Sequence, residues 1–89
     1  MARAFNLSML RGKLGLTPAE MAERMGLEGD EFLALEASPE KVQRRHQMLA
    51  HLASLDVAIE RGQPGLASTT MREKILAWHR LQTAQAPGG

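Results

Sequence analysis

The stretch LTPAEMAERMGLEGDEFLALE, residues 16–36, decides the fold. Thr17 is followed three residues later by Glu20, which is the spacing of a capping box, in which each residue satisfies a backbone N–H of the other. Pro18 stands between them at the first helical position, where proline is favoured because its missing N–H has no partner there. These signals predict a short helix over residues 18–25.

The rest of the stretch predicts a turn and a second short helix. Gly26 supplies the left-handed residue that ends many helices, and after a break at residues 27–29 a helix is expected over residues 30–37. The two helices and their turn have the spacing of a helix-turn-helix, whose second helix can enter a DNA major groove. Ala22 has to be small, because the two helices cross closely at its Cβ. Seven residues match the apolar, small and glycine positions of this arrangement: Met21, Ala22, Met25, Gly26, Leu27, Phe32 and Leu35.

Apolar spacing predicts two further helices around this pair. Upstream, a stripe at positions i, i+3 and i+7 indicates a helix over residues 6–14, formed by Leu7, Leu10 and Leu14. Downstream, Ser38 as cap and Pro39 as first residue indicate a long amphipathic helix that runs to residue 61. Its apolar residues are spaced by four, three and four residues, which places them on one helix face: Met48, Leu52, Leu55 and Ile59.

The C-terminal part is expected to be a loop over residues 62–69, a helix over residues 70–84 and a fraying tail over residues 85–89. Thr70 and Glu73 form a second capping box at the start of the helix. Met71, Ile75 and Trp78 lie on one face of it, with Leu81 nearby. The chain is therefore an all-α, five-helix compact domain, in which residues 1–61 form the helix-turn-helix part.

Composition excludes several classes of protein. The 89 residues suffice for one core, 44% of them are apolar, and only three are aromatic, which disfavours a sheet. Cysteine is absent, so the chain has no disulfide, no thiolate zinc site and no cysteine nucleophile. There is no apolar run long enough for a membrane helix and no apolar signal core at the start, so a cytoplasmic protein is expected.

Charge is distributed unevenly although the net charge is only +1. Residues 1–27 carry +2 and residues 37–89 carry +3, whereas residues 28–36 carry −4 with no base. Three interpretations of this acidic block stay open: helix capping and solvation, a protein-binding face, or readout of DNA bases.

Residues 10–36, LRGKLGLTPAEMAERMGLEGDEFLALE, resemble the Xre/Cro-like helix-turn-helix regulators of bacteria and their phages. The shared features are Leu-Arg, a helix break, Ser/Thr before the second helix, Ala-Glu, a glycine, and a Glu at the end of the recognition helix. The resemblance covers about a third of the chain well and extends loosely to residue 61. It implies a lambda repressor-like fold and a sequence-specific DNA-binding regulator that acts as a homodimer.

The resemblance also implies a set of contact residues. Arg11 and the backbone near Thr17 would face phosphates, and the base-facing residues would be Glu28, Gly29, Asp30, Leu33 and Ala34. Family members usually carry polar or basic residues at these base-facing positions, so the acids here need compensation from cations that flank the groove. Candidates for that role are Lys13, Arg24, Lys41, Arg44 and Arg45.

Several residues carry more than one interpretation. Arg44 and Arg45 form either a phosphate clamp or a solvated helix start. His46 and His51 are five residues apart and do not share a helix face, so packing or surface roles are favoured over metal binding. The methionines on apolar stripes, Met48 and Met71 among them, are expected to fill the core. Trp78 either closes the core or anchors a dimer.

The sequence thus predicts a transcriptional regulator that binds double-stranded DNA as a homodimer, with the dimer contact at Met71, Ile75, Trp78 and Leu81. The rival hypothesis is a protein-interaction module whose acidic helix over residues 30–37 binds a basic partner. We expect no enzymatic activity, because the sequence has no nucleophile elbow, phosphate loop or paired acid and base, and we expect no cofactor or metal.

Overall fold

The computed structural model describes residues 5–84 and consists of five α-helices, with two short 3-10 turns, among those residues. The α-helices are α1 (Leu7–Leu14), α2 (Pro18–Met25), α3 (Gly29–Ala37), α4 (Arg44–Arg61) and α5 (Thr69–Ala84); the 3-10 turns are η1 (Pro39–Lys41) and η2 (Pro64–Leu66). The prediction of an all-α domain with five helices is confirmed. The predicted tail over residues 85–89 lies outside the described residues.

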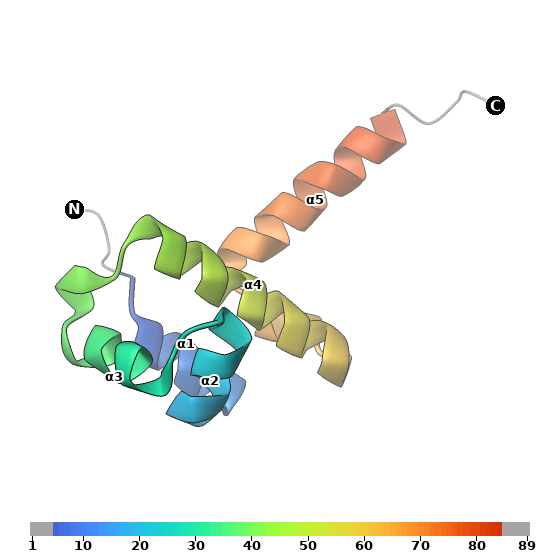
Figure 1. Cartoon of the computed structure of the whole chain (residues 1–89). Coiled ribbons are helices and arrows are strands. Elements are labelled where there is room, and N and C mark those ends of the chain that lie inside the picture. The colour runs from blue at the N-terminus through green and yellow to red at the C-terminus, as the bar shows by residue number, and fades with distance from the viewer. Residues whose placement is uncertain (1–4, 85–89) are drawn as a thin grey trace.

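The first four helices form the body of the molecule. In Figure 1, α1, α2 and α3 lie together on one side of α4, and α5 extends away from them as a separate rod. The body and α5 together measure 53 × 32 × 19 Å along the principal axes. The radius of gyration, 15.2 Å, exceeds the roughly 12 Å expected of a compact chain of this length, because α5 projects.

The core lies between α1–α3 and one face of α4. Leu14, Met21 and Phe32 are fully buried in it, and the other members of this buried apolar cluster are Leu7, Leu16, Ala22, Met25, Leu35, Ala50, Ala53 and Val57. The buried face of α4 consists of small or medium side chains, which lets three short helices approach its backbone closely. The stripe predicted for the helix at residues 6–14 is confirmed, with Leu10 half-buried beside the buried Leu7 and Leu14.

The start of α4 differs from the prediction. Pro39 begins η1, a single 3-10 turn, and the chain is extended at Val42 and Gln43 before α4 starts at Arg44. Ser38 makes no side-chain cap bond. The backbone N–H of Gln43 instead donates to Nδ1 of the buried His46 at 2.9 Å, so a histidine inside the helix stabilises its first turn.

The apolar stripe of α4 does not face the core. Met48, Leu52 and Ile59 are exposed, and Leu55 is half-buried. The expectation that Met48 fills the core is therefore wrong, and Met71 is only half-buried. The reason is that the opposite stripe of α4 offers alanines, and these fit the crowded seam beneath three helices where longer side chains would not.

The start of α5 also differs from the prediction. The helix begins at Thr69, and the hydroxyl of Ser68 accepts the backbone N–H of Met71 at 3.3 Å. Ser68 is thus the N-cap, the role that was predicted for Thr70. Ser68 is held in place by two contacts from α4: its N–H donates to Ser54 Oγ at 2.9 Å, and its Oγ lies 2.8 Å from His51 Nδ1. Tertiary contacts thus select the capping residue.

Along the part of the chain that the structure describes, none of the helices has the length and apolar character needed to span a bilayer.

Candidate nucleic-acid interface

The pair α2–α3 is built as its local sequence predicts. Thr17 Oγ1 accepts the N–H of Glu20 at 3.1 Å, and Glu20 Oε1 accepts the N–H of Thr17 at 2.8 Å, which completes the capping box. The hydrogen bond from the backbone N–H of Thr17 to the carboxylate lowers the pKa of Glu20 below its usual value. Gly26 adopts φ +74°, a left-handed conformation that side chains disfavour, and it ends α2.

The contact between α2 and α3 matches the predicted pattern. Met21, Ala22, Met25, Phe32 and Leu35 are all buried, and Leu27 in the turn is half-buried. The N–H of Leu27 donates to Ala22 O at 2.9 Å, so the turn is closed by the backbone of the small residue itself. The two helices are therefore held in one relative orientation by a shared core.

The outward face of α3 is free. All five residues that the resemblance assigns to the bases are exposed: Glu28, Gly29, Asp30, Leu33 and Ala34. Glu31 is exposed beside them, and Leu33 is 51% exposed. Asp30 and Glu31 lie in the first turn of α3, where negative charge is stabilised by the helix dipole. This face is acidic at its start and apolar further along.

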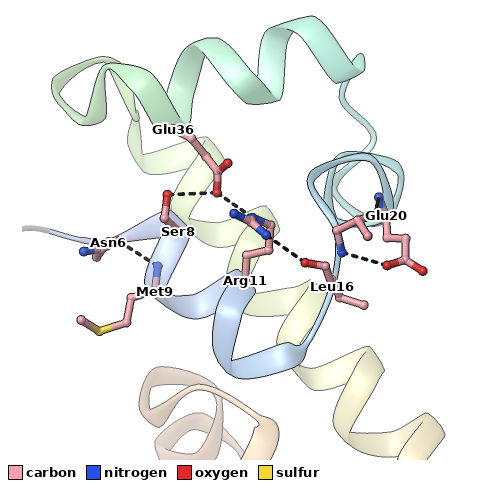
Figure 2. A network of polar contacts seen from close by, with 8 residues as sticks. Asn6, Ser8, Met9, Arg11, Leu16, Glu20 and Glu36 are labelled. Atoms are coloured by element: carbon pink, nitrogen blue, oxygen red, sulfur yellow. Dashed lines mark hydrogen bonds and ion pairs between the residues drawn. The ribbon is translucent and has the colours of Figure 1, made fainter.

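Arg11 is engaged inside the body. Its Nε donates to Glu36 Oε2 at 2.8 Å and its NH1 donates to the carbonyl of Leu16 at 3.0 Å, while Ser8 Oγ donates to the same Glu36 oxygen at 3.0 Å (Figure 2). Both partners of the ion pair are mostly buried, with side chains 25% and 12% exposed. This cluster ties α1 and the turn before α2 to the end of α3, so it fixes how α3 is presented.

Arg24 is also engaged. Its two terminal nitrogens donate to the two carboxylate oxygens of Glu60, each at 2.7 Å, in the bidentate geometry that arginine and carboxylate favour. The hydrogen bonds to Glu60 raise the pKa of Arg24, and the same bonds lower the pKa of Glu60. The pair joins α2 to the end of α4. Sequence reasoning missed both ion pairs, because the two residues of each pair are far apart in the chain, by 25 residues in one pair and 36 in the other.

The remaining candidate cations are exposed and lie in two places. Lys41 in η1 and Arg44 at the start of α4 follow α3 directly in the chain. Lys13 and Arg45 line hollows that also include residues of α5: Lys13 with Thr69 and Thr70, and Arg45 with Met71 and Lys74. The residues that the resemblance assigns to the bases therefore lie together on α3 or directly before it, whereas Lys13 and Arg45 lie towards α5.

The two histidines of α4 have packing roles, as expected. His46 is buried at the start of the helix, and His51 is half-buried between Ser68 and the ring of Phe5, whose centroid is 5.3 Å from that of the imidazole. Burial lowers the pKa of His51. Within residues 5–84, no group of three or more acidic or histidine side chains lies close enough to hold a metal ion.

Trp78 is 59% exposed on α5, which contradicts the interpretation that it closes the core. The other residues predicted for the dimer contact are also accessible: Met71 is half-buried, and Ile75 and Leu81 are exposed. Sequence reasoning missed Leu76, which is exposed one position beyond Ile75, about 100° around the helix.

Comparisons with protein-family models, curated proteins and solved structures find no match for this chain.

Proposed function

We propose that this chain is a regulator of transcription that binds double-stranded DNA through α2 and α3 and acts as a homodimer in the cytoplasm. The observation that supports it most is the presentation of α3. Phe32 and Leu35 anchor one side of the helix in the core, and its opposite side is free from Glu28 to Ala34. An α-helix with its side chains is about 10–12 Å in diameter and fits the major groove, which is about 12 Å wide.

Acids on the base-facing side are compatible with this function under two conditions. A carboxylate can accept a hydrogen bond from the amino group of cytosine, so Asp30 and Glu31 favour sites with cytosine near the start of α3. Cations must also contact the phosphates on either side of the groove. Lys41 and Arg44, which follow α3 and are exposed, are the nearest in the chain.

The salt dependence of DNA binding tests the proposal. A pool of random duplexes is selected against the protein, and the affinity for the enriched sequence is measured at several salt concentrations. Lys41→Ala with Arg44→Ala is expected to weaken binding and to reduce the salt slope by up to about two, roughly one for each lost phosphate contact. The matched control is Lys74→Ala with Arg80→Ala, which removes the same charge from α5. Absence of DNA affinity at low salt would overturn the proposal.

A second function is favoured by the charges of α3. The ion pairs within the described residues occupy Arg11 with Glu36 and Arg24 with Glu60, which leaves Glu28, Asp30 and Glu31 exposed without those cations. A face with three acids and the apolar Leu33 complements a basic, partly apolar protein surface.

One pair of substitutions separates the two functions. Asp30→Asn with Glu31→Gln removes two negative charges from α3 with little change in shape. If α3 lies in the groove, the variant binds random DNA more tightly than the parent and loses its sequence preference, because the repulsion and the readout disappear together. If α3 binds a protein, the parent shows no DNA affinity at low salt and the substitution weakens binding to a lysine-rich peptide.

A further inference from the structure

Helix α5 has no buried residue along its whole described length, Thr69–Ala84. Its large apolar side chains are nevertheless numerous: Ile75, Leu76, Trp78 and Leu81 are each between 44% and 59% exposed. A helix gains most of its stability in a protein from packing an apolar face, so an isolated helix of 16 residues with this face in water is marginal. The structure of one copy therefore leaves α5 without the partner that its sequence requires.

Helix α4 offers a surface of the same kind. The apolar stripe that was expected in the core points outward, with Met48, Leu52 and Ile59 between 40% and 69% exposed. Beside Ile59, the C-terminal half of α4, η2 and the first turns of α5 enclose an open hollow of about 470 Å³. It is bordered mainly by apolar side chains, namely Leu55, Ala58, Ile59, Ile75 and Leu76. We call this the α4–α5 hollow.

We propose that α5 of one copy packs into the α4–α5 hollow of a second copy, and that its own hollow receives α5 of that copy in return. Trp78 and Leu81 of each copy fill the hollow beside Ile59 of the other. The inference rests on the homodimer of the proposed function and adds α4 as the receiving surface. Contact along α5 alone would leave Ile59 of α4 in water.

The exposed apolar surface is large enough for a dimer. The five large exposed side chains at this contact present on the order of 500 Å² per copy, which corresponds to a small interface beside the standard of about 800 Å² per partner. They are Ile59 on α4 and Ile75, Leu76, Trp78 and Leu81 on α5. The largest apolar patch on a monomeric protein is usually about 300–600 Å² and is often a functional surface. Because one chain carries both a free apolar helix and an apolar hollow, two copies cover both surfaces with a single two-fold contact.

Charge favours this hollow over the one on the other side of α5. The second hollow is bordered by Arg45 and Lys74. An incoming α5 carries three bases and one acid, so it would meet like charges there. The α4–α5 hollow has one bordering cation, Arg72. The basic helix therefore meets fewer like charges at the α4–α5 hollow than at the second hollow.

Two substitutions of matched exposure test the proposal. Ile59 on α4 is 69% exposed and Met9 on α1 is 70% exposed, so neither change disturbs the core of one copy. The parent is expected to sediment as a dimer at tens of micromolar. Ile59→Glu is expected to raise the dissociation constant at least tenfold, as is Trp78→Ala, whereas Met9→Glu leaves the dimer intact. Helix content by circular dichroism checks that each variant is folded. If Ile59→Glu does not fold, Ile59→Ala serves as a milder variant.

Trp78 is the single tryptophan of the chain, so its fluorescence reports directly on α5. Its emission is expected to shift to shorter wavelength as the parent is concentrated and to stay unshifted in folded Ile59→Glu. A parent that is monomeric up to hundreds of micromolar would overturn the proposal. So would a dimer that Trp78→Ala disrupts but folded Ile59→Glu and Ile59→Ala do not, since that dimer is held by α5 alone.

The experiment also separates this inference from the proposed function. Mass and fluorescence are measured without DNA, and DNA binding is measured in parallel for the parent and for Ile59→Glu. A dimer with no DNA affinity removes the DNA-binding function and keeps the contact between α4 and α5. A monomer that still binds DNA removes the contact and keeps the function.

Discussion

The body and α5 are both helical, but different interactions hold them. In the body, three short helices bury their apolar residues against the small side chains of α4, and buried or half-buried polar groups reinforce the packing. In α5, the large apolar residues face water and the helix is joined to α4 only near its start. Apolar residues at helical spacing therefore do not by themselves indicate a core, because a face of this kind can equally be reserved for a second molecule.

The largest expected effect is on the free energy of unfolding, when an aromatic side chain is truncated in the body and in α5. Phe32 in α3 is completely buried, so Phe32→Ala is expected to lower the free energy of unfolding by about 3–5 kcal/mol. Trp78→Ala, measured at a concentration where the chain is monomeric, is expected to change it by less than about 0.5 kcal/mol, as for other exposed positions. Urea denaturation of both variants checks this, and similar losses would show that α5 packs within one copy.

The next effect concerns the crossing of α2 and α3. Ala22 is 2% exposed there, so Ala22→Leu adds atoms to a filled contact and is expected to cost about 1–3 kcal/mol or more. Ala77→Leu adds the same atoms to an exposed position of α5 and serves as the control. Thermal melting of the two variants gives the comparison. A melting temperature of Ala22→Leu within a degree or two of the parent would mean that the helices do not cross at this residue.

The junction between the two regions should be more sensitive than α5 itself. Ser54 is completely buried and its Oγ accepts the N–H of Ser68 while donating to the carbonyl of His51 at 2.6 Å. Ser54→Ala leaves that buried N–H without a partner, which costs about 1–2 kcal/mol. The control is Ser8→Ala, which removes the exposed hydrogen bond from the Ser8 hydroxyl to Glu36. Hydrogen exchange should show faster opening at the start of α5 in Ser54→Ala, and equal exchange in both variants would contradict a structural role for this serine.

The smallest expected effect comes from His51, which makes the stability of the fold depend on pH. Burial lowers the pKa of His51 below 6.5, so the unfolded chain binds a proton at this site more readily than the folded chain does. The stabilisation is complete above about pH 6.5 and is lost as the pH falls from there towards the lower pKa of the folded state. Protonation would also place a positive charge beside Ser68 at the start of α5, where the helix dipole disfavours it.

Unfolding of the parent and of His51→Gln between pH 5.5 and 7.5 measures this effect. The parent is expected to lose more stability than the variant as the pH falls. The pKa values of Glu20 and Glu60 are lowered below 4.5, so these groups stay charged over this range. His46 and His79 are the same in both proteins and cancel in the difference. Parallel pH profiles would exclude a contribution of His51.

The difference between the two regions explains what the sequence could predict. Helices α2 and α3 were predicted within one residue at each end, because Thr17, Glu20 and Gly26 act on backbone groups only a few residues away. The inward face of α4 could not be predicted in this way. Its sequence contains an outer stripe of large apolar residues and an inner stripe of small ones, and the fit against three other helices decides between them.

The candidate site follows the same division. The exposure of Glu28, Asp30 and Leu33 was predictable from the spacing of α3, because the buried Phe32 and Leu35 define the opposite face. The engagement of Arg11 and Arg24 in ion pairs was not predictable, since it depends on residues brought close only by the complete fold. The same holds for Ser68, whose contacts with α4 decide where α5 begins.

The contact between Arg61 and α1 has a consequence for the order of folding. The guanidinium of Arg61, in the last turn of α4, donates to the carbonyl of Leu14 at 2.8 Å across 47 residues. Closing a loop of that length costs entropy before the contact gains anything, whereas the turn between α2 and α3 closes within a few residues. The pair α2–α3 should therefore form early, and the end of α4 should settle against Leu14 after the rate-limiting step. This contact then acts mainly on the lifetime of the folded state and hardly on the speed at which it is reached.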